Sequence, residues 1–150
     1  MSSHPMPLDL ERKLYLDGIH LFNTHEFFEA HEVWEDVWHG VYGVKHEFYQ
    51  GMIQAAVALE HYRRSNPRGV LSLARSYPPK FRNVPPKFMG LDVPMFLRDM
   101  DRVLRPVTTA NLTPDKGAIE LDLSTTPKIE LLYDPFETGE AERYNRDPIN

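Results

Sequence analysis

Apolar side chains recur every three or four residues through much of the chain before residue 106. That spacing puts them on one side of an α-helix, so it predicts helices rather than strands. The predicted helices cover 8–22, about 24–39, about 45–65, about 67–77 and a segment that begins after Asp92. The third of these is apolar nearly all round, which is typical of a helix at the centre of a bundle.

Short polar side chains mark the starts of several predicted helices. Asn23 is followed three residues later by Glu26, a capping-box pattern that predicts the start of the second helix. Asn66 stands directly before Pro67, and Asp92 stands two residues before Pro94; in both cases the proline fits the first turn of a helix. The two prolines at 78–79 predict an early end to the fourth helix, because proline has no N–H to donate.

The pattern changes after Pro106. Residues 119–123 alternate between apolar and acidic, and 129–133 is a second short run, so we expect extended segments or a hairpin lying on the helices. From residue 135 the chain is polar and is expected to be loose. The predicted fold is therefore all-α: a compact bundle of about five helices with a short extended C-terminal appendage. We expect a helical domain at 1–106, extended segments packed on it at 107–134 and a flexible polar tail at 135–150.

Composition restricts the function classes. Hydrophobic residues make up 41% of the chain and charged residues 26%, as in an ordinary folded protein. The absence of cysteine excludes disulfides and thiolate metal sites. The N-terminus lacks the basic and apolar regions of a signal peptide, and no apolar run has the roughly 20 residues that cross a bilayer, so a cytoplasmic protein without a membrane segment is expected. A net charge of −5 disfavours general nucleic-acid binding.

The second predicted helix has an unusual apolar stripe. At about 100° per residue, a histidine and a glutamate fall among the aromatic side chains of that stripe. Its members are Phe27, Phe28, His31, Trp34, Glu35 and Trp38. An unpaired ion among apolar groups costs several kcal/mol, so a buried glutamate needs a partner. His31 and Glu35 are about one helical turn apart, and we therefore predict that they pair in a buried pocket.

The third predicted helix has a matching polar face. Gln54 and His61 stand seven residues apart, Glu47 stands seven before Gln54, and Gln50 lies one turn away on the same side. The residues around them are small, which leaves room for a ligand between packed helices. If the second and third helices pack antiparallel, these side chains face His31 and Glu35.

These segments together resemble a known family. The runs Phe27-Phe28-Glu29-Ala30-His31-Glu32-Val33-Trp34-Glu35-Asp36-Val37-Trp38 and Phe48-Tyr49-Gln50-Gly51-Met52-Ile53-Gln54, followed by Asn66 and Gly69, resemble the bacterial and archaeal domain of unknown function 309 family. The hallmark HxxxExxW corresponds to His31, Glu35 and Trp38. The resemblance implies a compact helical fold and no established activity. His25 departs from it, because a small residue such as glycine is expected there.

Two interpretations of the stripe stay open. In one, His31 and Glu35 form a satisfied structural hydrogen-bond pair. In the other, His31, Glu35 and His61 hold a divalent metal, Zn²⁺ or Fe²⁺, or contact a small ligand, with Trp34, Trp38, Gln50 and Gln54 lining the site. Glu35 and His31 are then also the candidate catalytic groups of a hydrolytic reaction. A zinc-protease motif is disfavoured, because the second histidine is missing after both HExxE runs, at 25–29 and 31–35.

A basic segment suggests an alternative function. Between 61 and 91 there is no aspartate or glutamate, and the basic residues are Arg63, Arg64, Arg68, Arg75, Lys80, Arg82 and Lys87. Arg63, Arg64 and Arg68 surround a helix start, where anions are attracted. The alternative to a ligand or metal site is therefore a non-catalytic interaction module that presents this face, 63–87, to an acidic partner or an anionic ligand.

Overall fold

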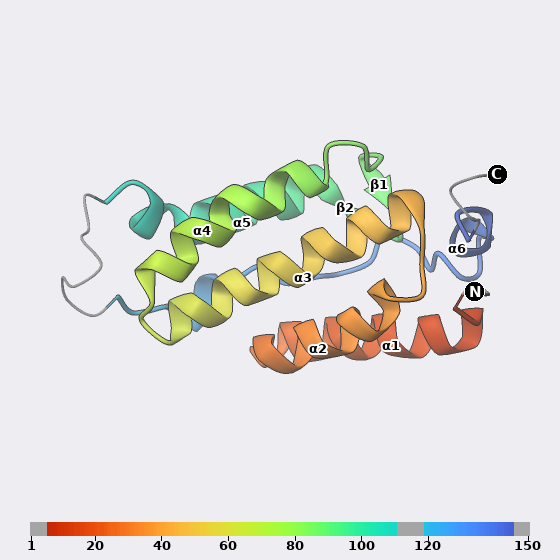
Figure 1. The fold of residues 1–150 in the computed structure, drawn as a ribbon, viewed down its shortest axis with the longest axis horizontal. Coiled ribbons are helices and arrows are strands. Elements are labelled where there is room, and N and C mark those ends of the chain that lie inside the picture. Colours follow the sequence, from red (N-terminus) through yellow and green to blue (C-terminus); the bar gives the residue numbers. More distant parts are fainter. Residues whose placement is uncertain (1–5, 111–118, 146–150) are drawn as a thin grey trace.

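The computed structural model describes residues 6–110 and 119–145, and it is all-α as predicted. Five long helices account for most of it (Figure 1). They are α1 (Leu8–Asn23), α2 (Phe27–Trp38), α3 (Gly43–Arg63), α4 (Pro67–Lys80) and α5 (Val93–Thr108). The smaller elements are the antiparallel pair β1 (Lys87–Phe88) and β2 (Leu91–Asp92), the 3-10 turn η1 (Leu123–Thr125) and α6 (Glu140–Arg143).

Helix α3 lies at the centre, between the α1–α2 pair and the α4–α5 pair (Figure 1). Its side chains are buried on nearly every side, including Phe48, Met52 and Leu59. This position confirms the interpretation of a sequence that is apolar nearly all round. None of the helices within the described ranges is both long and apolar enough to cross a bilayer.

The turn between α1 and α2 differs from the predicted capping box. Glu26, not Asn23, is the residue before α2, and no side chain caps that end. The amide of Asn23 instead donates to the Ile129 carbonyl at 2.9 Å and accepts from the Ile129 N–H at 2.8 Å. His25 takes a φ of 69°, the left-handed region that favours glycine, which explains why a small residue is expected there.

Two of the three predicted helix starts are confirmed. The side chain of Asn66 accepts from Gly69 N–H, and that of Asp92 accepts from Met95 N–H. The predicted end of α4 is wrong, because the helix continues through both prolines to Lys80. Proline adopts a helical φ, so both prolines fit the last turn of α4. The helix loses only the two hydrogen bonds that the missing N–H groups would have donated.

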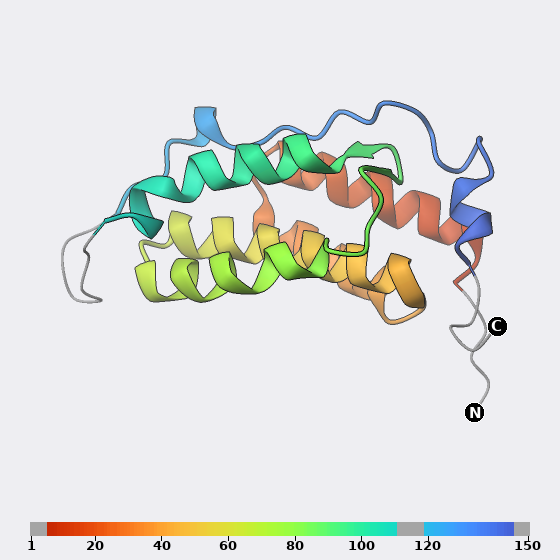
Figure 2. The ribbon, with the colours of Figure 1, turned by 90° about the horizontal axis from the view of Figure 1, so that it is seen from above.

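The C-terminal segment runs along α5 and then along α1 (Figure 2). It is extended, as predicted, but within its described residues it forms no hairpin. Besides the Asn23 contacts, the Leu132 N–H donates to the Gly90 carbonyl at 2.7 Å, and Arg12 pairs with Asp134 at 2.9 Å. These contacts attach the segment to α1 and to the turn between β1 and β2.

The prediction of a loose tail from residue 135 is wrong for 135–145. Pro135, Glu140 and Ala141 are buried, and 140–143 form α6. The Ala141 carbonyl accepts a 2.9 Å hydrogen bond from the ammonium group of Lys45, which is fully buried. A polar composition misled the prediction because the polar groups are bonded to the bundle rather than to water. Residues 146–150, the rest of the predicted tail, lie outside the described residues.

The ammonium of Lys45 also pairs with Glu11 at 2.7 Å, and neither side chain is exposed. The other carboxylate oxygen of Glu11 accepts from the Tyr49 hydroxyl at 2.8 Å. Burial, and then the Glu11 charge, raise the pKa of Tyr49 well above its usual value. The phenol therefore stays protonated and remains a donor to the carboxylate. This closed cluster joins α1, α3 and the segment around α6.

Candidate functional site

The predicted buried pair of His31 and Glu35 is not buried. Glu35 is exposed, His31 is half-buried, and no hydrogen bond joins them. The buried side of α2 is Phe27, Ala30, Trp34 and Val37, and Glu35 lies about 100° around the helix from Trp34. The stripe predicted from the sequence was therefore centred on the wrong position, and a catalytic or metal-ligating role for Glu35 in a closed pocket loses its basis.

The two tryptophans have different environments. Trp34 is fully buried, donates to the Tyr15 carbonyl at 3.3 Å and packs directly on Gly18, so it belongs to the core rather than to a ligand site. Trp38 is half-buried and stacks on His46 with ring centroids 4.6 Å apart. It lines a shallow hollow of about 310 Å³ at the α2–α3 turn. Of the two tryptophans, only Trp38 therefore keeps its predicted ligand-binding role, which stays a prediction.

A second hollow contains residues of the predicted histidine pocket and one arginine of the predicted anion site. It has a volume of about 220 Å³ and lies between α2 and the end of α3. Helix α2 contributes Phe28 and His31, and α3 contributes Val57, Glu60, His61 and Arg64. The packing of α2 against α3 thus brings His31 and His61 to one place, as expected. Gln50, Gln54 and Glu35 are not among its lining residues.

The hydrogen bonds of each histidine define its neutral tautomer. Nδ1 of His31 lies 2.7 Å from the Phe28 carbonyl, which can only accept, so Nδ1 carries the proton and Nε2 is left unprotonated. Nδ1 of His61 lies 3.0 Å from the amide nitrogen of Asn66. The orientation of that amide is determined by its oxygen, which accepts from Gly69 N–H. Nδ1 of His61 is therefore the acceptor, and its Nε2 carries the proton.

Glu60 is the charged group of the hollow that the sequence analysis missed. Its side chain is buried, and Arg63 donates to it at 2.9 Å from α3 itself. Arg64 donates to the other carboxylate oxygen through Nε. The guanidinium of Arg64 also lies 6.0 Å from the centre of the Phe28 ring, within reach of a cation–π contact. The sequence did contain a signal for this cluster: Arg63 and Arg64 follow Glu60 by three and four residues, a spacing that predicts ion pairs along a helix.

The predicted metal set is not assembled. Across residues 6–110 and 119–145, no three histidine or acidic side chains are grouped so as to hold a metal ion. Glu35 is outside the hollow, and the His61 nitrogen bonded to Asn66 is already an acceptor. To bind a metal through Nε2, His61 would have to turn Nδ1 into a donor facing the Asn66 amide, which would break the cap of α4.

The basic segment is only partly free to bind a partner. Arg63 and Arg64, two of the three arginines predicted to bind an anion, are paired with Glu60. Arg68 is exposed and has no ion pair within the described part of the chain. One carboxylate shared by two arginines leaves a net positive charge at the hollow. Of the three arginines, only Arg64 lines the hollow that holds His31 and His61.

Comparison with known proteins supports the resemblance. Residues 15–73 match the family model described as domain of unknown function (DUF309). Over 96 residues, 63% of this chain, the sequence is 28% identical to an uncharacterized protein of Aquifex aeolicus (strain VF5). Over 63 residues, 41% of this chain, it is 40% identical to the uncharacterized protein YpuF of Bacillus subtilis (strain 168). These matches span 28% and 36% of the two relatives, respectively.

Proposed function

Residues 15–73 match the DUF309 family model, and we propose that this segment binds a small molecule bearing an oxyanion, a phosphate or a carboxylate, in the hollow between α2 and α3. The observation behind the proposal is that His31, His61 and Arg64 line one hollow although α2 and α3 are separate in the sequence. All six lining residues lie within the segment that matches the family. The proposed function is therefore one of binding, at a site that the family segment builds alone.

The charge of the hollow favours an anion. Arg64 lines the hollow, and Arg63, which does not line it, pairs with the same Glu60 carboxylate, so these three side chains together carry one net positive charge. Arg64 uses its Nε–H for Glu60, so its two terminal nitrogens still have hydrogens to donate. A guanidinium presents these hydrogens in a planar fork that matches a carboxylate or a phosphate. A carboxylate that already holds the arginine in place makes that fork preorganised for a ligand.

The histidines add polar groups of complementary type. His61 keeps a proton on Nε2, which can donate to an oxyanion, and His31 keeps a lone pair on Nε2, which can accept from a ligand hydroxyl. Phe28 and Val57 supply apolar surface beside them. The volume of about 220 Å³ limits the ligand to a small one. A small phosphorylated or carboxylated compound with a hydroxyl group fits these features best.

The proposal is tested by calorimetric titration of the full chain with inorganic phosphate and, separately, with acetate. We expect saturable binding of phosphate to one site. Arg64→Ala and His61→Gln should each weaken it by at least about tenfold, the equivalent of losing one charge-assisted hydrogen bond. The matched controls are Arg82→Ala, an exposed arginine of the same basic segment, and His20→Gln, an exposed histidine on α1. Both should bind phosphate as the unchanged protein does.

Two results would overturn the proposal. One is phosphate binding that Arg82→Ala weakens as much as Arg64→Ala does, which would indicate attraction to the basic surface in general. The other comes from a titration with Zn²⁺ alone. If one equivalent of Zn²⁺ bound and both His31→Ala and His61→Gln abolished it, the hollow would be a metal site, as one interpretation of the sequence had it.

A further inference from the structure

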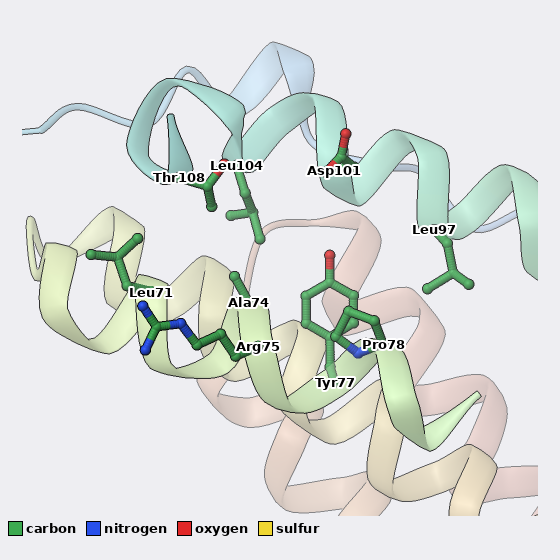
Figure 3. Close-up of a pocket in the computed structure, with 9 residues that line it drawn as sticks. All are labelled: Leu71, Ala74, Arg75, Tyr77, Pro78, Leu97, Asp101, Leu104 and Thr108. Atoms are coloured by element: carbon green, nitrogen blue, oxygen red, sulfur yellow. The ribbon is translucent and has the colours of Figure 1, made fainter. Parts of the chain in front are cut away.

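The groove between α4 and α5 has a volume of about 390 Å³ and is larger than either of the two hollows described above. Apolar side chains from both helices form its walls, among them Leu71, Leu97 and Leu104. Arg75 and Tyr77 line it from α4, and Asp101 lines it from α5. Figure 3 shows Tyr77 rising from α4 with its hydroxyl directed toward α5, while Arg75 extends along α4. Most of this groove lies outside the segment that matches the family.

Tyr77 is a largely buried side chain whose hydroxyl still reaches the groove and has no hydrogen-bond partner among the described residues. Only 4% of Tyr77 is exposed. The hydroxyls of Tyr15, Tyr49 and Tyr133 each have a hydrogen-bond acceptor, but that of Tyr77 has none within the described ranges. A hydroxyl that reaches the wall of a groove and lacks a protein partner is placed to bond a ligand or water. Burial, and then the charge of Asp101, raise the pKa of Tyr77 to about 12, so the hydroxyl remains a donor.

The charges of the groove are unequal. Asp101 is already paired with Arg105 at 2.6 Å. Arg75 is exposed and has no ion pair among residues 6–110 and 119–145. The uncompensated charge at the groove is therefore positive. An anionic group near Arg75 gains a partner, whereas a cationic group would have to compete with Arg105 for Asp101.

From these observations we propose a second binding site, distinct from the hollow of the preceding section: the α4–α5 groove binds a small organic acid with an apolar body and one carboxylate. The body packs on the leucines of the two walls, the carboxylate pairs with Arg75, and the Tyr77 hydroxyl donates to a ligand oxygen. The volume of the groove falls within the roughly 300–1,000 Å³ typical of small-molecule sites.

The test compares two probes of equal chain length and opposite charge, octanoate and octylamine, by calorimetry with the full chain. Octanoate should bind at one site and at least about tenfold more tightly than octylamine. Arg75→Gln should abolish that preference. Tyr77→Phe should weaken octanoate binding several-fold and so reduce, without abolishing, the preference for the acid. Arg82→Gln, which removes another exposed arginine of the same segment, is the matched control and should change neither.

Unfolding curves of each variant show whether it is folded, and binding is compared only between folded forms. Octylamine binding as tightly as octanoate would overturn the proposal, because Asp101 rather than Arg75 would then select the ligand. Octanoate binding that Arg75→Gln leaves unchanged would overturn it as well, and so would the absence of any saturable binding. His61→Gln, which tests the phosphate site, should not affect octanoate, so failure of one site is distinguishable from failure of the other.

Discussion

Replacing Lys45 by methionine removes the cation from a fully buried ion pair, and we expect a large loss of stability. Lys45 donates to Glu11 at 2.7 Å and to the Ala141 carbonyl at 2.9 Å. Without the ammonium, the Glu11 carboxylate keeps only the Tyr49 hydroxyl, at 2.8 Å, as a partner. Removing one partner of a buried pair typically costs about 3–5 kcal/mol, because the other charge stays desolvated.

Urea unfolding near neutral pH, followed by circular dichroism, measures this cost. The matched control is Lys13→Met, since Lys13 pairs with Asp17 at 2.6 Å on the exposed face of α1. An exposed pair contributes about 0–1 kcal/mol, so the control should unfold close to the unchanged protein. The double variant Lys45→Met with Glu11→Leu should recover part of the loss, because it leaves no buried charge.

A loss of less than about 1 kcal/mol in the free energy of unfolding of Lys45→Met, the level of the exposed control, would contradict a closed buried ion pair. A double variant less stable than the single one would contradict it as well. Either result would mean that water reaches the Glu11 carboxylate and that the cluster is not closed.

Three further effects are expected. Gly18→Ala should destabilise the fold by about 1–3 kcal/mol in urea unfolding, because an added Cβ would lie 2.0 Å from Nε1 of Trp34. Asn23→Ala should lower the free energy of unfolding by about 1–3 kcal/mol, because it removes two part-buried hydrogen bonds to Ile129. Hydrogen exchange of the Ile129 amide should also accelerate, and unchanged exchange would contradict the contact. Burial lowers the pKa of His46, so the unfolded chain takes up this proton first as pH falls below about 6.5, and the free energy of unfolding should decrease toward acid pH. His46→Phe should reduce that acid dependence, and an equal dependence in the variant would contradict the assignment.

The local parts of the fold could be predicted from the sequence. Helical spacing and the caps Asn66 and Asp92 are encoded by neighbouring residues, so the corresponding helices begin where expected. The Asn23 pattern failed because the Asn23 amide does not cap α2 but forms two hydrogen bonds with the backbone of Ile129, in a distant segment. No neighbouring residue reports such a contact. The same holds for Lys45, whose partner Ala141 is nearly a hundred residues away, at a separation of 96.

The candidate site was predicted in part. The expected packing of α2 on α3 brings His31 and His61 to one hollow. The orientation of α2 was misjudged because its large aromatic residues suggested a stripe around His31, whereas Phe28 remains 42% exposed and the smaller Ala30 is buried. Size and hydrophobicity alone do not determine which of two overlapping stripes faces the core; the packing of Trp34 on Gly18 does.

The most direct test of the oxyanion site is a long-range ¹H–¹⁵N NMR spectrum of the histidine rings, recorded with and without inorganic phosphate. The tautomers inferred above predict a free His31 protonated at Nδ1 and a free His61 protonated at Nε2. Phosphate should then shift the ring signals of both residues and leave those of the exposed His20 unchanged. Signals of His31 and His61 that stay in place at saturating phosphate, or move no more than those of His20, would contradict the account.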